Sequence, residues 1–161
     1  MADLYLAELC ADFPAVMITG PRAAGKTTTA AQHVEQIVRL DQPGVAAAFR
    51  ADPDAALRRA ARPVLLDEWH AVPEVLGAVK RSVDSDTTPG QFILTGSVRA
   101  ELGNETWAGT GRIVRMSMYP LVERELQPRL DLGRSSFLAR LTTSSVDELI
   151  VPPEDIGFVD P

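Results

Sequence analysis

The segment Ala15–Thr27 reads AVMITGPRAAGKT, and it decides the fold. Its first five residues, Ala15–Thr19, are mostly apolar and are followed at once by Gly20, which is typical of a buried β-strand. The eight residues Gly20–Thr27 match the pattern G-x-x-x-x-G-K-[ST], known as Walker A. We therefore predict a buried strand, a glycine-rich loop and a helix, the arrangement in which backbone N–H groups surround a phosphate.

The residue types of this loop suit a nucleotide. Its glycines allow the backbone to curl, so that N–H groups point at phosphate oxygens. Lys26 would reach the β- and γ-phosphates, and the Thr27 hydroxyl would bind Mg²⁺. The candidate ATP-binding residues are Gly20, Pro21, Arg22, Ala23, Ala24, Gly25, Lys26, Thr27 and Thr28.

A second motif follows Lys26 by about 40 residues. The apolar run Val64–Leu66 ends in two carboxylates, Asp67 and Glu68, as in a Walker B motif. We interpret Asp67 as a Mg²⁺ ligand through water, and Glu68 as the catalytic residue that orients or deprotonates the attacking water. By itself, an apolar run before two acidic residues is weak evidence for a Walker B motif, since acidic residues often begin loops. When the pair follows a phosphate-binding loop in the chain, the two adjacent carboxylates favour a hydrolase over a small-molecule kinase, because hydrolysis needs a positioned water.

Two further candidates follow along the chain. Phe92–Leu94 is predicted to be a strand, and ligands of open α/β sheets bind beyond the carboxyl ends of the strands. Thr95 or Ser97 would then lie near the γ-phosphate, although a plain turn fits the same residues. Arg112 either is a surface residue or acts in trans as an arginine finger on the nucleotide of a second copy.

Trp69 and His70 follow the two carboxylates directly. We interpret them as a packing residue and a surface ring. A metal site is disfavoured, because His33 is the only other histidine in the chain.

The rest of the chain alternates between helical and strand patterns. The predicted helices are one at about 4–13, one after the loop that is stopped at residues 42–44, one at 55–61, one beginning near Pro73 and one at 120–126. The other predicted strands are Val45–Phe49 and a weak one at about 113–118. This alternation predicts a parallel α/β sheet.

Composition narrows the class of protein. The chain has 161 residues, enough for about one domain, and 45% of them are hydrophobic. The net charge of −6 argues against direct binding of nucleic acid, which relies on clustered positive charge. We find no apolar run of membrane-spanning length and no signal peptide pattern. The single cysteine, Cys10, cannot form an internal disulfide, so we expect a reducing, cytoplasmic location.

The order GPRAAGKTTTA, PVLLDEWH, QFILTGS and GTGRIVRMSMYPL resembles prokaryotic AAA+-type P-loop ATPases over roughly residues 4–126. The resemblance implies a three-layer α/β core with a five-stranded, mostly parallel sheet in the order 5-1-4-3-2. It also implies ATP and Mg²⁺ at the carboxyl ends of the strands, with Thr95 or Ser97 as the sensor residue and Arg112 as the arginine finger.

The resemblance also sets expectations for domains and assembly. Residues 1–130 are expected to form the AAA+-like ATP-binding domain, and residues 131–161 a C-terminal tail or truncated linker. Relatives usually continue into a helical lid and a nuclease-like C-terminal domain, of which we find no pattern here. Three functions follow: an ATPase that is a homo-oligomer if Arg112 acts in trans, a nucleotide-binding module without useful turnover, and a small-molecule kinase.

Overall fold

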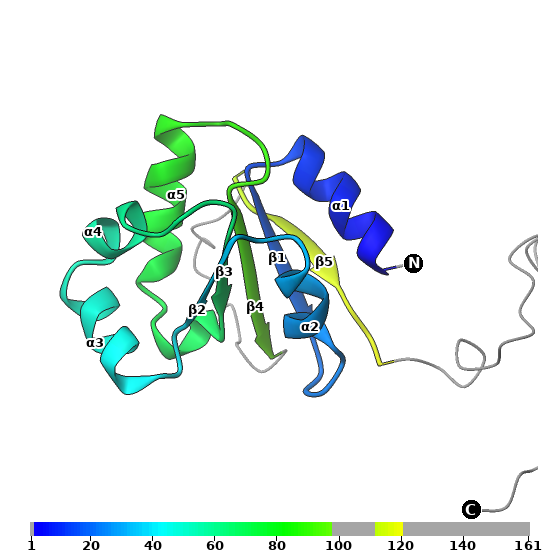
Figure 1. The fold of residues 1–161 in the computed structure, drawn as a ribbon, viewed down its shortest axis with the longest axis horizontal. Helices are drawn as coiled ribbons and strands as arrows, with labels where there is room; N and C mark the ends of the chain where they lie inside the picture. The colour runs from blue at the N-terminus through cyan, green and yellow to red at the C-terminus, as the bar shows by residue number, and fades with distance from the viewer. Residues whose placement is uncertain (1, 98–111, 121–161) are drawn as a thin grey trace, which may run out of the picture. The chain divides into compact units, whose positions relative to one another are not determined.

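Five parallel strands form one sheet in the order β2-β3-β4-β1-β5, as predicted (Figure 1). The computed structural model describes residues 2–97 and 112–120, which fall within one compact unit, Met1–Leu121. All four strand pairings are parallel. The strands are β1 Ala15–Gly20, β2 Gln36–Arg39, β3 Val64–Asp67, β4 Phe92–Ser97 and β5 Val114–Ser117.

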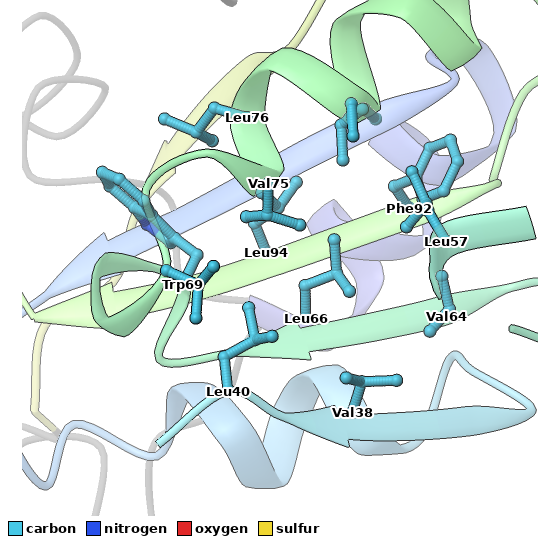
Figure 2. Packing of buried hydrophobic residues seen from close by; sticks show 14 of the residues in the cluster. Val38, Leu40, Leu57, Val64, Leu66, Trp69, Val75, Leu76, Phe92 and Leu94 are labelled. Carbon is cyan, nitrogen blue, oxygen red and sulfur yellow. The ribbon is translucent and has the colours of Figure 1, made fainter. Parts of the chain in front are cut away.

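Helices cover both faces of the sheet, so the described fold has three layers (Figure 1). On one face, α1 (Ala2–Asp12) and α2 (Lys26–Ala31) cover a smaller core. On the other face, the short helix η1 (Trp69–Ala71), α3 (Pro43–Ala51), α4 (Pro53–Arg58) and α5 (Val75–Ser85) cover a larger one. Figure 2 shows part of this larger core. The central strands are apolar on both sides, as expected of a parallel sheet between helices.

Two predictions between the loop and β3 are wrong. The helix after the loop ends at Ala31, and the strand next to β3 is Gln36–Arg39. The β-branched pair Ile37 and Val38 lies in that strand, where Val38 is buried and Ile37 is exposed. The predicted strand Val45–Phe49 is part of α3, because alanine favours a helix and Pro43 is well placed in its first turn.

The other predicted elements within the described residues are confirmed, whereas the short helix η1 was not predicted. Helix α4 begins after Asp52, whose side chain accepts a hydrogen bond of 2.8 Å from the Ala55 N–H and so caps the helix. Helix α1, strands β3, β4 and β5, and helix α5 lie where they were expected. The predicted helix at 120–126 and the predicted tail at 131–161 lie outside the described residues, apart from Pro120.

Side-chain alternation decides which polar residues meet. Leu65 packs in the smaller core, and Asp67, two residues later, therefore projects toward the α1 and α2 face. Ile93 also packs there, so Thr95 projects the same way from the neighbouring strand β4. Asp67 and Thr95 are partners in the β3–β4 register, and both lie at the carboxyl edge of the sheet.

The last residue of β1 has to be glycine. A Cβ atom built on Gly20 would lie 1.9 Å from the carbonyl oxygen of Met118, which follows β5. The Met118 N–H also donates a 2.7 Å hydrogen bond to the Thr19 carbonyl. Met118 thus contacts the start of the loop and fixes where that loop leaves the sheet.

Within residues 2–97 and 112–120, no helix combines the length and the apolar character needed to span a membrane.

Candidate functional site

Lys26 is a buried lysine at the first position of α2, with 8% of its surface exposed. Its ammonium donates hydrogen bonds to two carbonyls of its own loop, Gly20 O at 3.0 Å and Pro21 O at 2.7 Å. A buried ammonium is stable only when it is paired in this way. Lys26 therefore lies inside the curve of the loop.

One carboxylate oxygen joins the loop to the two central strands. Asp67 Oδ1 accepts a 2.9 Å hydrogen bond from the Thr27 hydroxyl and a 2.5 Å hydrogen bond from the Thr95 hydroxyl. Thr95 is fully buried, and Asp67 is 8% exposed. The structure thus brings together three residues that the sequence pointed to separately, and charge-assisted hydrogen bonds of this kind are among the stronger ones.

The other loop residues differ in exposure. Ala24 is buried, whereas Arg22 and Thr28 are exposed. After Gly20, which ends β1, two loop residues have positive φ: Gly25 at 85°, and Ala23 at 61°, which is uncommon for a residue with a side chain. The loop is therefore held in a conformation that its own sequence does not favour, a feature that clusters at ligand sites.

Glu68 follows β3 directly and turns the chain sharply. Its backbone is left-handed, with φ 54° and ψ 48°. Its carboxylate oxygen Oε2 is shielded from solvent and accepts no hydrogen bond from the described residues. The Nδ1 atom of His70 lies 3.2 Å from this oxygen.

Trp69 is the packing residue and His70 the exposed ring that the sequence suggested, and the two residues also contact each other and their neighbours. The Trp69 ring is buried in the larger core beside β4 (Figure 2), and the two rings meet edge to face. A Cβ atom built on Gly96 would lie 2.8 Å from Trp69 Nε1 and 3.5 Å from His70 Nδ1. The absence of a side chain at Gly96 leaves room for the Trp69 indole, whereas the distance to His70 is an ordinary contact. Sequence reasoning missed the contact between His70 and Glu68, and the only signal was the nearness of the two residues along the chain.

Ser97 and Arg112 stand apart from the three-residue cluster. Ser97 ends β4, is half-buried and pairs in register with Gly20. Arg112 precedes β5, at the amino edge of the sheet, and its Nε donates a 2.7 Å hydrogen bond to Asp84 Oδ1 on α5. Arg112 therefore lies at the opposite edge of the sheet from Lys26 and Asp67.

The donor set of the cluster fits Mg²⁺ in type. Magnesium prefers oxygen ligands and is usually held by one or two carboxylates together with phosphates and water. Asp67 and Thr27 supply one carboxylate and one hydroxyl, already 2.9 Å apart. Among the residues that the structure describes, no group of three or more His, Cys, Asp or Glu side chains forms a protein-only metal site.

A cavity lies in another part of the described fold. This cavity of about 910 Å³ is bounded by β2, α3 and α4, and none of its lining residues belongs to the loop or to the cluster around Asp67.

Comparison with known proteins agrees with this fold. A family model described as an AAA domain matches residues 12–127. An uncharacterized protein of Mycobacterium bovis and one of Mycobacterium tuberculosis are each 30% identical over 115 residues, which is 65% of this chain and 25% of the relative. The chain thus spans about a quarter of the length of these curated relatives. Because the family match covers most of the described fold, the chain belongs to the AAA domain family of ATP-binding P-loop modules.

Proposed function

We propose that this chain binds ATP together with Mg²⁺ and hydrolyses it to ADP and phosphate. The observation that carries the proposal is the shared oxygen of Asp67, which accepts hydrogen bonds from Thr27 of the loop and Thr95 of β4. It joins a phosphate-binding loop pattern to the carboxyl edge of a parallel sheet, where ligands of such sheets bind.

The loop residues would hold the phosphates. In our proposal, the N–H groups of Gly20–Thr28 surround the β-phosphate, and Lys26 exchanges its two carbonyl partners for phosphate oxygens. The exchange is favourable because phosphate oxygens carry a full negative charge, whereas the carbonyl oxygens that Lys26 now contacts are neutral. Thr27 and Asp67 would hold the metal ion. Mg²⁺, when bound there, supplies positive charge that offsets the charge of the phosphates.

Three residues would complete the chemistry. Glu68 is proposed to orient or deprotonate the attacking water. Between the two sensor candidates, we assign the γ-phosphate contact to Ser97, because the Thr95 hydroxyl already donates to Asp67 and is fully buried. Arg112 lies at the far edge of the sheet, so an arginine finger at this position would serve a second copy of the chain, and the active form would be a homo-oligomer.

A second candidate is a nucleotide-binding module without useful turnover. Two observations favour it: the Glu68 carboxylate faces His70, and Arg112 is paired with Asp84 of its own chain. In that case the chain would act as a binding or regulatory remnant. The small-molecule kinase is disfavoured, since adjacent carboxylates suit activation of water. The lone, half-buried Cys10 and the net charge of −6 support a cytoplasmic protein that does not itself bind nucleic acid.

The deciding experiment is phosphate release from ATP by the purified chain, with and without Mg²⁺. We expect turnover that requires Mg²⁺ and falls by about two orders of magnitude or more in Glu68→Gln. Lys26→Ala should abolish both binding and turnover. If the wild type releases no more phosphate than Glu68→Gln while it still binds ATP, the second candidate is correct. Phosphate transfer to an added metabolite would support the kinase instead.

A further inference from the structure

We propose that the cavity between β2 and the helices α3 and α4, here called the β2 groove, binds an extended, acidic peptide segment of a partner protein. The segment would add to the sheet as a further strand beside β2. The inference goes beyond the proposed ATPase activity and does not depend on it, because no residue that lines the groove belongs to the loop or to the cluster around Asp67.

Strand β2 has an open side. It is the last strand in the order β2-β3-β4-β1-β5, and β3 is its only strand partner within the described part of the chain. The N–H groups of Gln36 and Leu40 donate to carbonyls at the two ends of β3, at 3.3 and 3.0 Å. Because alternate residues of a strand direct their backbone groups to opposite sides, the N–H and C=O of Ile37 and the N–H of Arg39 point to the open side.

The groove follows this open side. Strand β2 contributes all four of its residues, Gln36–Arg39, to the lining, and Figure 1 shows α3 and α4 on the β2 side of the sheet. The volume of about 910 Å³ lies in the range of about 300–1,000 Å³ that is typical of ligand pockets. Unpaired backbone groups in a row pair readily with another strand, and peptides bind many proteins in this way. The occupant is therefore extended rather than helical.

The groove offers apolar surface to alternate side chains of such a strand. On the face of β2 that carries Val38, the lining includes Val45 and Phe49 of α3 and Ala56 of α4. Val38 and Phe49 are nearly buried, whereas Ile37, on the opposite face of β2, is 41% exposed. Side chains of an added strand would lie on these two faces in turn, so we expect apolar residues at alternate positions of the peptide.

The charged residues of the groove favour a carboxylate. Three of them line it: Arg39, Asp52 and Arg59. The Asp52 carboxylate caps α4 through the N–H of Ala55, at a helix end whose dipole offsets negative charge. Arg39 and Arg59 are exposed, and their positive charge dominates the groove although the chain carries a net charge of −6. A guanidinium binds a carboxylate through two parallel hydrogen bonds, so an acidic segment complements this rim.

A second copy of the chain is the competing occupant. Pairing of β2 with β2 of another copy would bring two Arg39 side chains, one from each copy, onto the same four-residue ribbon. Like charges close together on paired strands are destabilising. An acidic segment of a different protein meets no such repulsion and is therefore the occupant that the charges favour.

The first test is a selection of random seven-residue peptides, displayed on phage, against the purified full chain. We expect the selected peptides to alternate apolar residues and to carry at least one Asp or Glu. Fluorescence polarisation of the best synthetic peptide should show a loss of affinity of about tenfold in Arg39→Glu and in Arg59→Glu. Arg58→Glu is the matched control, because it makes the same charge change at the end of α4 but outside the groove. No enrichment, or an equal loss in all three variants, would overturn the proposal.

The second test reads the backbone of β2 directly. Amide hydrogen exchange, followed by NMR, should be fast at Ile37 and Arg39 in the free chain and about tenfold slower or more with the peptide bound. Val38, whose N–H faces β3, serves as the internal control. Ile37→Pro removes the outward N–H and keeps the bonds to β3, so it should weaken peptide binding without unfolding the strand. A peptide that binds without protecting Ile37 and Arg39 would show that no strand is added.

Two controls separate this inference from its alternatives. Self-association of the chain, measured by sedimentation, should be the same in wild type and in Ile37→Pro. If Ile37→Pro abolishes it, the groove pairs with a second copy and the proposal is wrong. Peptide affinity should be unchanged in Lys26→Met, so a failure of ATP binding and a failure of peptide binding are observed independently.

Discussion

Polar side chains at the two edges of the sheet differ in how completely they are hydrogen-bonded. At the amino edge, the guanidinium of Arg62 donates hydrogen bonds to Gln91 and, at 2.8 Å, to Ser82, and lies 4.6 Å from the centre of the Phe92 ring. The Gln91 amide in turn donates to two backbone carbonyls at 2.8 Å. Each of these side chains forms hydrogen bonds with the polar groups next to it.

At the carboxyl edge, polar atoms are left over. Glu68 Oε2 and Trp69 Nε1 are buried and have no hydrogen-bond partner among the described residues, and they account for two of the three such side-chain atoms; the third, His33 Nε2, lies between α2 and β2. The two non-glycine residues with positive φ in the described chain, Ala23 and Glu68, also lie at this edge. Such strain and unpaired groups reduce stability, and folded proteins tolerate them mainly at functional sites. We therefore infer that the polar groups at the amino edge stabilise the fold, and that those at the carboxyl edge are available to bind a ligand.

Among these variants, Lys26→Met is expected to show the largest difference between its effect on ATP affinity and its effect on stability. The variant removes a buried ammonium whose partners are two carbonyls, so we expect unchanged or slightly increased stability. Affinity for Mg·ATP should fall about 100-fold or more, since the charged partner of the phosphates is lost. Isothermal titration and chemical unfolding measure the two effects, and a variant with wild-type affinity would remove Lys26 from the site.

Arg62→Met at the amino edge is expected to have the opposite effect, a loss of stability without a loss of ATP affinity. It keeps an apolar side chain over Phe92 but leaves Gln91, which is 5% exposed, without its charged donor. We expect a loss of about 2 kcal/mol in the free energy of unfolding, with ATP affinity unchanged. Urea unfolding measures the loss, and a parallel fall in ATP affinity would show that the edges are not independent.

A smaller, mixed effect is expected from Thr95→Val. The substitution conserves shape and removes the hydroxyl that donates to Asp67. Stability should fall by about 1 kcal/mol, and affinity for Mg·ATP by about tenfold, because Asp67 loses one of its two orienting donors. The matched control is Ser97→Ala, which we expect to lower turnover more than binding.

The smallest effect concerns acid stability. A hydrogen bond from Arg81 holds the pKa of Asp54 below its usual value of 3.8. A lowered pKa in the folded state stabilises the fold above the unfolded pKa, and this contribution is lost as pH falls through the folded value. Asp54→Asn should thus lower Tm slightly at pH 6, and the difference from wild type should shrink below about pH 4. A difference that stays constant down to pH 2 would contradict this assignment.

Much of the site could be predicted because its residues follow local rules. Strands β1 and β3 are short apolar runs that end in Gly20 and Asp67, and β4 carries Thr95 after its apolar run Phe92–Leu94. Parallel strands bring these ends to one edge. The segment around β2 could not be read correctly, since Val34, Ile37 and Val38 satisfy a helical spacing as well as a strand. Strand β2 forms because its backbone pairs with β3, a contact that no local pattern contains.

The contact between Glu68 and His70 escaped prediction for a different reason. It needs a positive φ at a glutamate, which is uncommon, and a gap over β4 that arises only because Gly96 lies opposite Trp69. Neither condition is visible in the spacing of residues 67–70. Features that depend on strain and on close approach between elements are the ones that sequence patterns miss.

The most direct test of the central claim is a thermal melt of wild type, Lys26→Met and Arg62→Met, each with and without Mg·ATP. A ligand that binds only the folded state stabilises it by RT ln(1 + [L]/Kd), about 2.7 kcal/mol at a hundredfold excess over Kd. We predict that nucleotide raises Tm equally in wild type and Arg62→Met, although the latter starts lower, and leaves Lys26→Met unchanged. An equal rise in all three proteins, or no rise in wild type, would contradict a nucleotide site at the carboxyl edge.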